Sequence, residues 1–132
     1  MSQTNVQLTL FNDMMFLAYL GRVLVAVPLL LFGVGHFMKA VPMSNMVPSY
    51  MPVSQSFWIY LTGVALILAA LSYLTGVFTK LAAFLLAIMV LCFAFMVHLP
   101  GVQAEGMDSA SFASLLKDLM IAGGAIYVGT KA

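Results

Sequence analysis

Charged side chains are nearly absent from this chain. Of 132 residues, five are Lys or Arg and four are Asp or Glu, whereas 64% are hydrophobic. A water-soluble domain of this size would expose apolar patches far larger than soluble monomers tolerate. A nucleic-acid partner is also excluded, because phosphate binding needs clustered Lys and Arg, and the net charge is only +1. The composition therefore favours a membrane protein, with the lipid bilayer as its main partner.

Cysteine is scarce too, since Cys92 is the single thiol and lies between Leu91 and Phe93. One thiol cannot form an internal disulfide, and no Cys-x-x-Cys motif is present to shuttle electrons. We therefore expect Cys92 to be a small packing residue. Lys and Arg are missing before Asp13 as well, so the N-terminus lacks the basic region of a cleaved signal peptide.

Long apolar stretches make up most of the chain. Each is near or above the ~20 residues that an α-helix needs to cross a hydrocarbon core of ~30 Å. They predict an all-α integral membrane protein of one domain, folded as an up-down-up-down four-helix bundle. The predicted spans are residues 14–39, 57–75, 80–99 and 112–130. The rest is an N-terminal cytoplasmic segment at 1–13, a Pro-containing outer loop at 40–56 and an outer loop at 100–111.

Residues typical of helix ends flank these spans. The predicted N-caps are Asn12 or Asp13 for the first helix, Ser54 or Ser56 for the second, and Ser109 or Ser111 for the last. Gly76 is the predicted stop of the second helix. The short link that follows makes the second and third helices antiparallel neighbours. Three prolines between residues 40 and 56 argue against a regular helix there.

The few charges predict an orientation. Arg22, Lys80 and Lys131 fall on one side of the predicted bundle, whereas Lys39, Glu105 and Asp108 fall on the other. The positive-inside rule then places both termini in the cytoplasm.

Small residues recur at spacings that let helices approach closely, including Ala65 with Ala69 and Gly33 with Gly35. The last helix has a stripe of Asp118, Ala122, Ala125 and Gly129, which share one face at 100° per residue. We expect this stripe to face the interior of the bundle.

Polar side chains within the spans are costly, so each is a candidate for function. Arg22, near the cytoplasmic end, would anchor an anionic head group or snorkel to the interface. The candidates at the outer end are His36, Tyr60, His98 and Asp118. They are compatible with a quinone or another small ligand, or with a polar network that only fixes helix register.

Two metal-based alternatives are less favoured. Haem ligation by His36 and His98 has no specific motif behind it. A soft metal would need clustered, exposed thioethers, and Met43, Met46 and Met51 are spaced loosely for that purpose. We therefore expect no metal site.

Several short segments, taken in order, resemble the DoxX-like family of small membrane proteins. The resemblance covers about residues 14–130 and rests on Arg22, Gly35-His36-Phe37, Tyr60-Leu61-Thr62-Gly63, Gly76-Val77-Phe78-Thr79-Lys80-Leu81-Ala82, His98-Leu99-Pro100, Leu116-Lys117-Asp118-Leu119 and Gly123-Gly124. It implies a four-helix protein of the plasma (inner) membrane. One departure is Leu66, which stands where many relatives have a Glu, and Asp118 is left as the only acid expected inside the bundle.

This resemblance implies two classes of function. The first is an auxiliary subunit of a membrane-associated redox system, linked to quinone or thiol chemistry and partnered by another membrane protein. The alternative is a non-enzymatic scaffold, assembly factor or chaperone-like protein. The chain has no self-contained catalytic motif, and the sequence leaves a homo-oligomer open.

Overall fold

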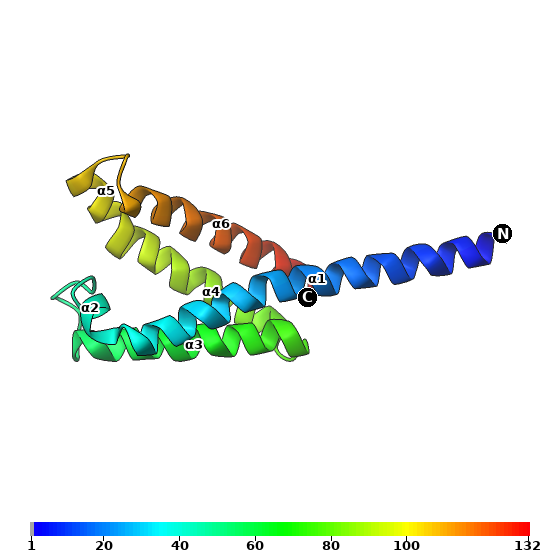
Figure 1. The fold of residues 1–132 in the computed structure, drawn as a ribbon, viewed down its shortest axis with the longest axis horizontal. Coiled ribbons are helices and arrows are strands. Elements are labelled where there is room, and N and C mark those ends of the chain that lie inside the picture. Colours follow the sequence, from blue (N-terminus) through cyan, green and yellow to red (C-terminus); the bar gives the residue numbers. More distant parts are fainter. Residues whose placement is uncertain (1) are drawn as a thin grey trace.

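The structure is a computed structural model that describes residues 2–132, and these residues form helices but no strands (Figure 1). In chain order the helices are α1 (Gln3–Met38), α2 (Ala40–Ser44), α3 (Gln55–Thr75), α4 (Thr79–Phe93), α5 (Leu99–Glu105) and α6 (Ala110–Lys131), with a π-helical segment, Ala94–His98, between α4 and α5. Four helical stretches are long and apolar enough to cross a membrane, if α4 to α5 is counted as one. The all-α prediction is confirmed.

Several predicted helix ends are also confirmed. The Ser54 hydroxyl accepts a hydrogen bond from the Phe57 amide at 3.2 Å, and the Ser109 hydroxyl accepts one from Phe112 at 3.3 Å. Gly76 ends α3 with a φ of 77°, a left-handed conformation that glycine adopts without strain. The turn from α3 to α4 is therefore tight.

The predicted start of the first helix was wrong. Ser2, rather than Asn12 or Asp13, is the N-cap of α1, and its hydroxyl accepts a hydrogen bond from the Asn5 amide. No glycine or proline precedes Gly21, so nothing in the segment 1–13 stops the helix from extending towards the N-terminus. At 36 residues α1 is about 54 Å long, and its N-terminal part projects alone beyond the other helices (Figure 1).

Both predicted outer loops, 40–56 and 100–111, are partly helical. Pro42 lies in the first turn of α2, where a backbone N–H has no intrahelical partner to lose. Pro100 lies in the first turn of α5, so the third span continues to Glu105 and the second outer loop shrinks to residues 106–109. Proline was read as a helix stop, but it is tolerated in a first turn.

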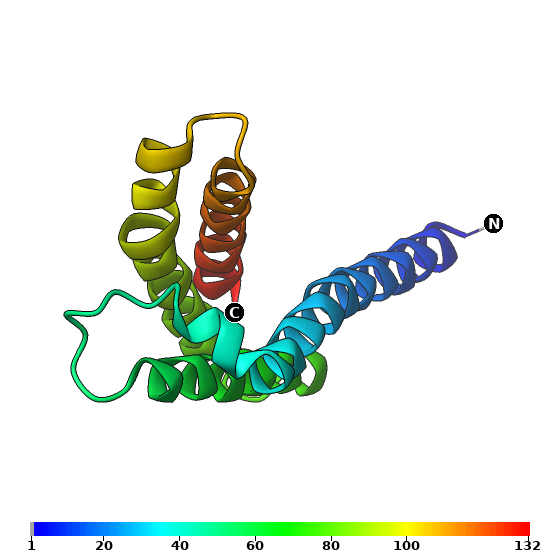
Figure 2. The same ribbon diagram turned by 60° about the vertical axis from the view of Figure 1, so that its left-hand side comes forward.

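The helices are arranged as two pairs. α1 lies along α3, and α4 lies along α6, while α3 and α4 are joined by the turn at residues 76–78. The pairs meet near this turn and diverge away from it (Figures 1 and 2). The buried core lies where they meet, and its members are Ala26, Leu29, Leu66, Ala69, Ala70, Tyr73, Ala83, Leu86, Ala87, Val90, Ala122 and Ala125.

The pair α1–α3 is in backbone contact at two glycines. A Cβ built on Gly33 would lie 2.9 Å from the Gly63 carbonyl oxygen and 2.7 Å from Ile67 Cγ1. A Cβ on Gly63 would lie 3.1 Å from the Gly33 oxygen. Neither site has room for a side chain, so Gly33 and Gly63 set the distance between α1 and α3.

Gly33→Ala and Gly35→Ala should have opposite effects on stability. Gly33→Ala forces the helices apart and should destabilise the fold by about 1–3 kcal/mol. The matched control is Gly35→Ala in the same helix, where no atom lies within 4 Å of the new Cβ. It should be neutral or stabilising by up to about 1 kcal/mol, because alanine favours helix. Unfolding of the detergent-solubilised variants measures both, and equal effects would contradict the predicted close contact.

Candidate functional site

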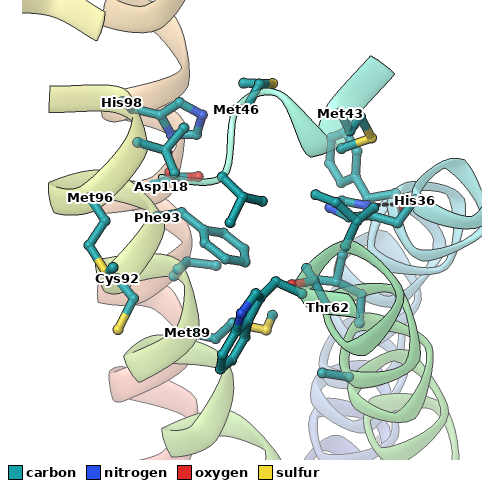
Figure 3. A pocket seen from close by; sticks show the side chains of 18 of the residues that line it. His36, Met43, Met46, Thr62, Met89, Cys92, Phe93, Met96, His98 and Asp118 are labelled. Carbon is teal, nitrogen blue, oxygen red and sulfur yellow. Dashed lines mark hydrogen bonds and ion pairs between the residues drawn. The ribbon is translucent and has the colours of Figure 1, made fainter. Parts of the chain in front are cut away.

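A large pocket lies between the diverging helix pairs. Its volume is about 660 Å³, within the range of about 300–1,000 Å³ typical of small-molecule sites. Most of its wall is apolar. The polar and charged side chains that line it are His36, Trp58, Thr62, His98, Ser114, Lys117 and Asp118. Figure 3 labels four of them, His36, Thr62, His98 and Asp118. Such a pocket fits a ligand with an apolar body and a polar head group.

The centre of the polar wall is a hydrogen-bonded pair, His98 and Asp118. His98 Nδ1 lies 2.5 Å from Asp118 Oδ2, and Asp118 is only 2% exposed. Because the carboxylate accepts, Nδ1 holds the proton and donates it. The carboxylate therefore fixes the imidazole tautomer. An unpaired carboxylate at this depth would be strongly destabilising, so the two residues depend on each other.

The backbone before His98 departs from the α-helix. Residues Ala94–His98 are π-helical, and the Leu99 amide donates to the Ala94 carbonyl, five residues back. Pro100 follows, and it has no N–H to continue the α-helical pattern. Single π-helical turns within helices are frequent at functional sites. Here the extra residue changes the rotation of the helix just where His98 meets Asp118 of α6.

Lys117 joins the two helix pairs across the pocket. Its Nζ lies 3.7 Å from Asp118 Oδ1 and 5.1 Å from the centre of the Phe32 ring on α1. The Lys117 side chain is 45% exposed, so the ion pair is weak, and the cation–π contact adds a modest attraction. Asp118 thus has a partner on each carboxylate oxygen.

His36 lies on the opposite wall of the pocket, on the last turn of α1. Its Nδ1 is 2.7 Å from the Phe32 carbonyl oxygen, which accepts a hydrogen bond, so Nδ1 again holds the proton. Neither Nε2 of His36 nor Nε2 of His98 is hydrogen-bonded within residues 2–132. When neutral, both rings therefore keep a free lone pair.

The loop after α2 is tied down beside the pocket. The Trp58 indole N–H donates to the Pro52 carbonyl at 2.7 Å, and the Gln55 side-chain amide donates to the Val47 carbonyl at 2.5 Å. These bonds hold the loop against the start of α3. As a result Met46, Val47 and Met51 form part of the pocket wall.

The structure brings together three of the five predicted site residues, namely His36, His98 and Asp118. Tyr60 is 45% exposed and packs on the Phe37 ring at 5.6 Å, outside the pocket. Arg22 lies near the middle of α1, beside the turn between α3 and α4, where its guanidinium donates to the Thr79 hydroxyl at 3.5 Å and approaches Gly76. Arg22 therefore contacts the turn between α3 and α4, where it also meets the negative end of the α3 dipole.

Three other expectations have clear outcomes. The stripe Asp118, Ala122, Ala125 and Gly129 is buried, as predicted. Leu66, which the DoxX-like resemblance singled out as a departure, is buried in the core. Cys92 is exposed and lines the pocket, so its prediction as a packing residue was wrong.

Sequence reasoning missed Ser114 and Thr62 as pocket residues. Ser114 precedes Asp118 by four positions, and this spacing places both on one helix face. That signal was available in the sequence. Thr62 gave none, because a lone threonine in an apolar span is common and hydrogen-bonds within its own helix.

Fold and site together define a class: an all-helical protein with four potential membrane-spanning helices around a mostly apolar pocket. Within this class the chain belongs to the family described as "Domain of unknown function (DUF8561)", which matches residues 25–110. The match includes His36, Tyr60 and His98, whereas Arg22 and Asp118 lie outside it. No curated protein and no solved structure matches the chain.

Double-mutant cycles should separate the two contacts of Asp118. Replacing His98 and Asp118 with Ala, singly and together, should give a coupling energy of about 1.5–3 kcal/mol, as expected for a buried charged hydrogen bond. The same cycle for Lys117 and Asp118 should give less than about 1 kcal/mol, because Lys117 is half exposed. The free energy of unfolding in detergent is the measurement. Equal coupling energies for the two pairs would contradict the prediction that the buried contact is the stronger one.

Proposed function

We propose that this protein binds a quinone in the membrane, as an auxiliary subunit of a redox system. The observation that supports it best is the pocket, in which an apolar wall surrounds the His98–Asp118 pair. A quinone has an apolar tail and a flat ring with oxygen atoms at opposite edges. His98 and His36, on opposite walls, suit the two edges of such a ring (Figure 3).

The proposal includes a membrane arrangement. The chain spans the plasma membrane four times in up-down-up-down order, with both termini in the cytoplasm. The basic residues Arg22, Lys80 and Lys131 support this orientation. The pocket then opens in the outer half of the membrane, and reporter enzymes fused to either terminus test the orientation.

The protonation of the histidines favours the reduced form of the quinone. A hydroquinone donates hydrogen bonds through two hydroxyls, and the free Nε2 lone pairs of His36 and His98 accept them. Oxidation of the hydroquinone releases two protons and two electrons. His98 Nε2 takes one proton, with the Asp118 carboxylate beside the resulting imidazolium, and His36 Nε2 takes the other. The electrons pass to the redox partner, which is the role that a DoxX-like auxiliary subunit implies.

Binding can be followed through Trp58, because it is the single tryptophan and lines the pocket. A short-chain quinone should quench its fluorescence saturably in purified full-length protein, more tightly when reduced than when oxidised. Asp118→Asn and His98→Ala should each weaken binding of the reduced form by about tenfold or more, the value of a hydrogen bond to a charged group. Asp108→Asn, in the loop 106–109, is the control. Quenching that is non-saturable, or the same in all variants, would contradict the proposal.

An assembly or scaffold role is the second candidate. It is favoured by α1, whose N-terminal part projects away from the rest of the fold and exposes Phe11, Phe16 and Leu17 (Figure 1). Such a helix offers a surface to another membrane protein.

Purification from native membranes in mild detergent separates the two candidates. For an auxiliary subunit we expect one redox enzyme to be recovered in a fixed ratio to this chain. Its recovery should be unchanged by His98→Ala, because His98 lines the pocket between the chain's own helices and is not proposed to contact the partner. Varied membrane proteins in small amounts, lost when residues 2–13 are deleted, would instead support the scaffold. The deletion is compatible with folding, because these residues belong to the part of α1 that projects beyond the other helices, and all except Val6 are exposed (Figure 1).

A further inference from the structure

The pocket also gathers soft donor atoms. Met43 lies on α2, Met46 on the loop that follows, and His36 on the last turn of α1, and all three line the pocket. Met46 is 53% exposed, and Met43 is half-buried. In Figure 3 the two methionines lie along the rim of the pocket between His36 and His98. From the sequence we judged the loop methionines too loosely spaced to form a metal site. In the structure α2 and the loop after it place Met43 and Met46 at the same edge of the pocket as His36.

The histidines are prepared as ligands. A metal-binding histidine almost always donates its other ring N–H to a carbonyl or carboxylate, which orients the lone pair. His36 makes this contact with the Phe32 carbonyl, at 2.7 Å. Its Nε2 is therefore a neutral nitrogen donor with a fixed tautomer.

The donor set selects the kind of metal. Within residues 2–132 no group of three or more His, Cys, Asp or Glu side chains is placed to hold a metal ion, which leaves no basis for a zinc site. The only carboxylate at the pocket, Asp118, is bonded to His98 and Lys117. Thioether sulfur with imidazole is instead a ligand set for Cu(I).

We propose that His36, Met43 and Met46 form a Cu(I) site at the rim of the pocket. All three ligands are uncharged, so a complex with a monovalent ion places a single positive charge next to the apolar wall, whereas a divalent ion would place two. Met46 is exposed enough to receive the ion first, and His36 and Met43 complete the site. Quinone binding requires neither methionine, but both proposals use His36 Nε2, so this nitrogen binds either Cu(I) or a hydroquinone hydroxyl at one time.

The test uses the purified full-length protein and Cu(I) alone, under reducing anaerobic conditions, in competition with a coloured Cu(I) chelator. One equivalent should be withdrawn from the chelator. Met43→Leu, Met46→Leu and His36→Ala should each weaken Cu(I) binding by roughly 10- to 100-fold, at least the effect of losing an outer contact of a ligand. X-ray absorption of the wild-type complex should show both sulfur and nitrogen neighbours of copper.

Met89→Leu is the matched control, because Met89 lines the same pocket but lies on α4, away from the rim (Figure 3). Leucine is close to methionine in volume, so the variants should keep the fold. Cu(I) binding that is absent in the wild type, or unchanged in Met43→Leu and Met46→Leu, would overturn the proposal. Asp118→Asn, which should weaken quinone binding, removes no proposed Cu(I) ligand and should bind Cu(I) as the wild type does, so the two proposals fail separately.

Discussion

The short turn between α3 and α4 is the constraint on which the other features of the fold depend. It joins the two helix pairs at one end, where a core made largely of alanines lets all four long helices approach. Gly76 permits the left-handed start of the turn, and Arg22 lies against it from α1. Beyond this core, larger side chains such as Phe32, Met89 and Phe93 lie between the pairs and line the pocket. The pocket therefore begins where the alanine-rich core ends and these larger side chains take its place between the helix pairs.

Polar residues occur in this pocket because they satisfy one another. Asp118 would be costly to bury alone, but one of its oxygens accepts from His98 and the other faces Lys117. Lys117 in turn contacts Phe32 on the other helix pair. The network therefore stabilises the spacing of the pairs while it leaves His98 Nε2 free.

Much of the fold could be predicted from the sequence. The four spans, the caps at Ser54 and Ser109, the stop at Gly76 and the buried stripe on α6 follow from local chemistry. The divergence of the helix pairs could not be predicted, because pocket-facing and outward-facing side chains are equally apolar here. The π-helical segment was not predicted either. The third helix was expected to end at residue 99, although a first-turn proline such as Pro100 is compatible with a continued helix.

The candidate site was only partly predictable. Depth along the helices was enough to group His36 with His98 and Asp118, but Tyr60 required knowledge of helix rotation, and Arg22 belongs to the other end. What the sequence could not supply was the state of each ring. Both histidines donate through Nδ1, so both present a lone pair at Nε2. The two free lone pairs suit hydrogen-bond donors and electrophilic cations, the classes to which the hydroquinone and the Cu(I) ion that we propose belong.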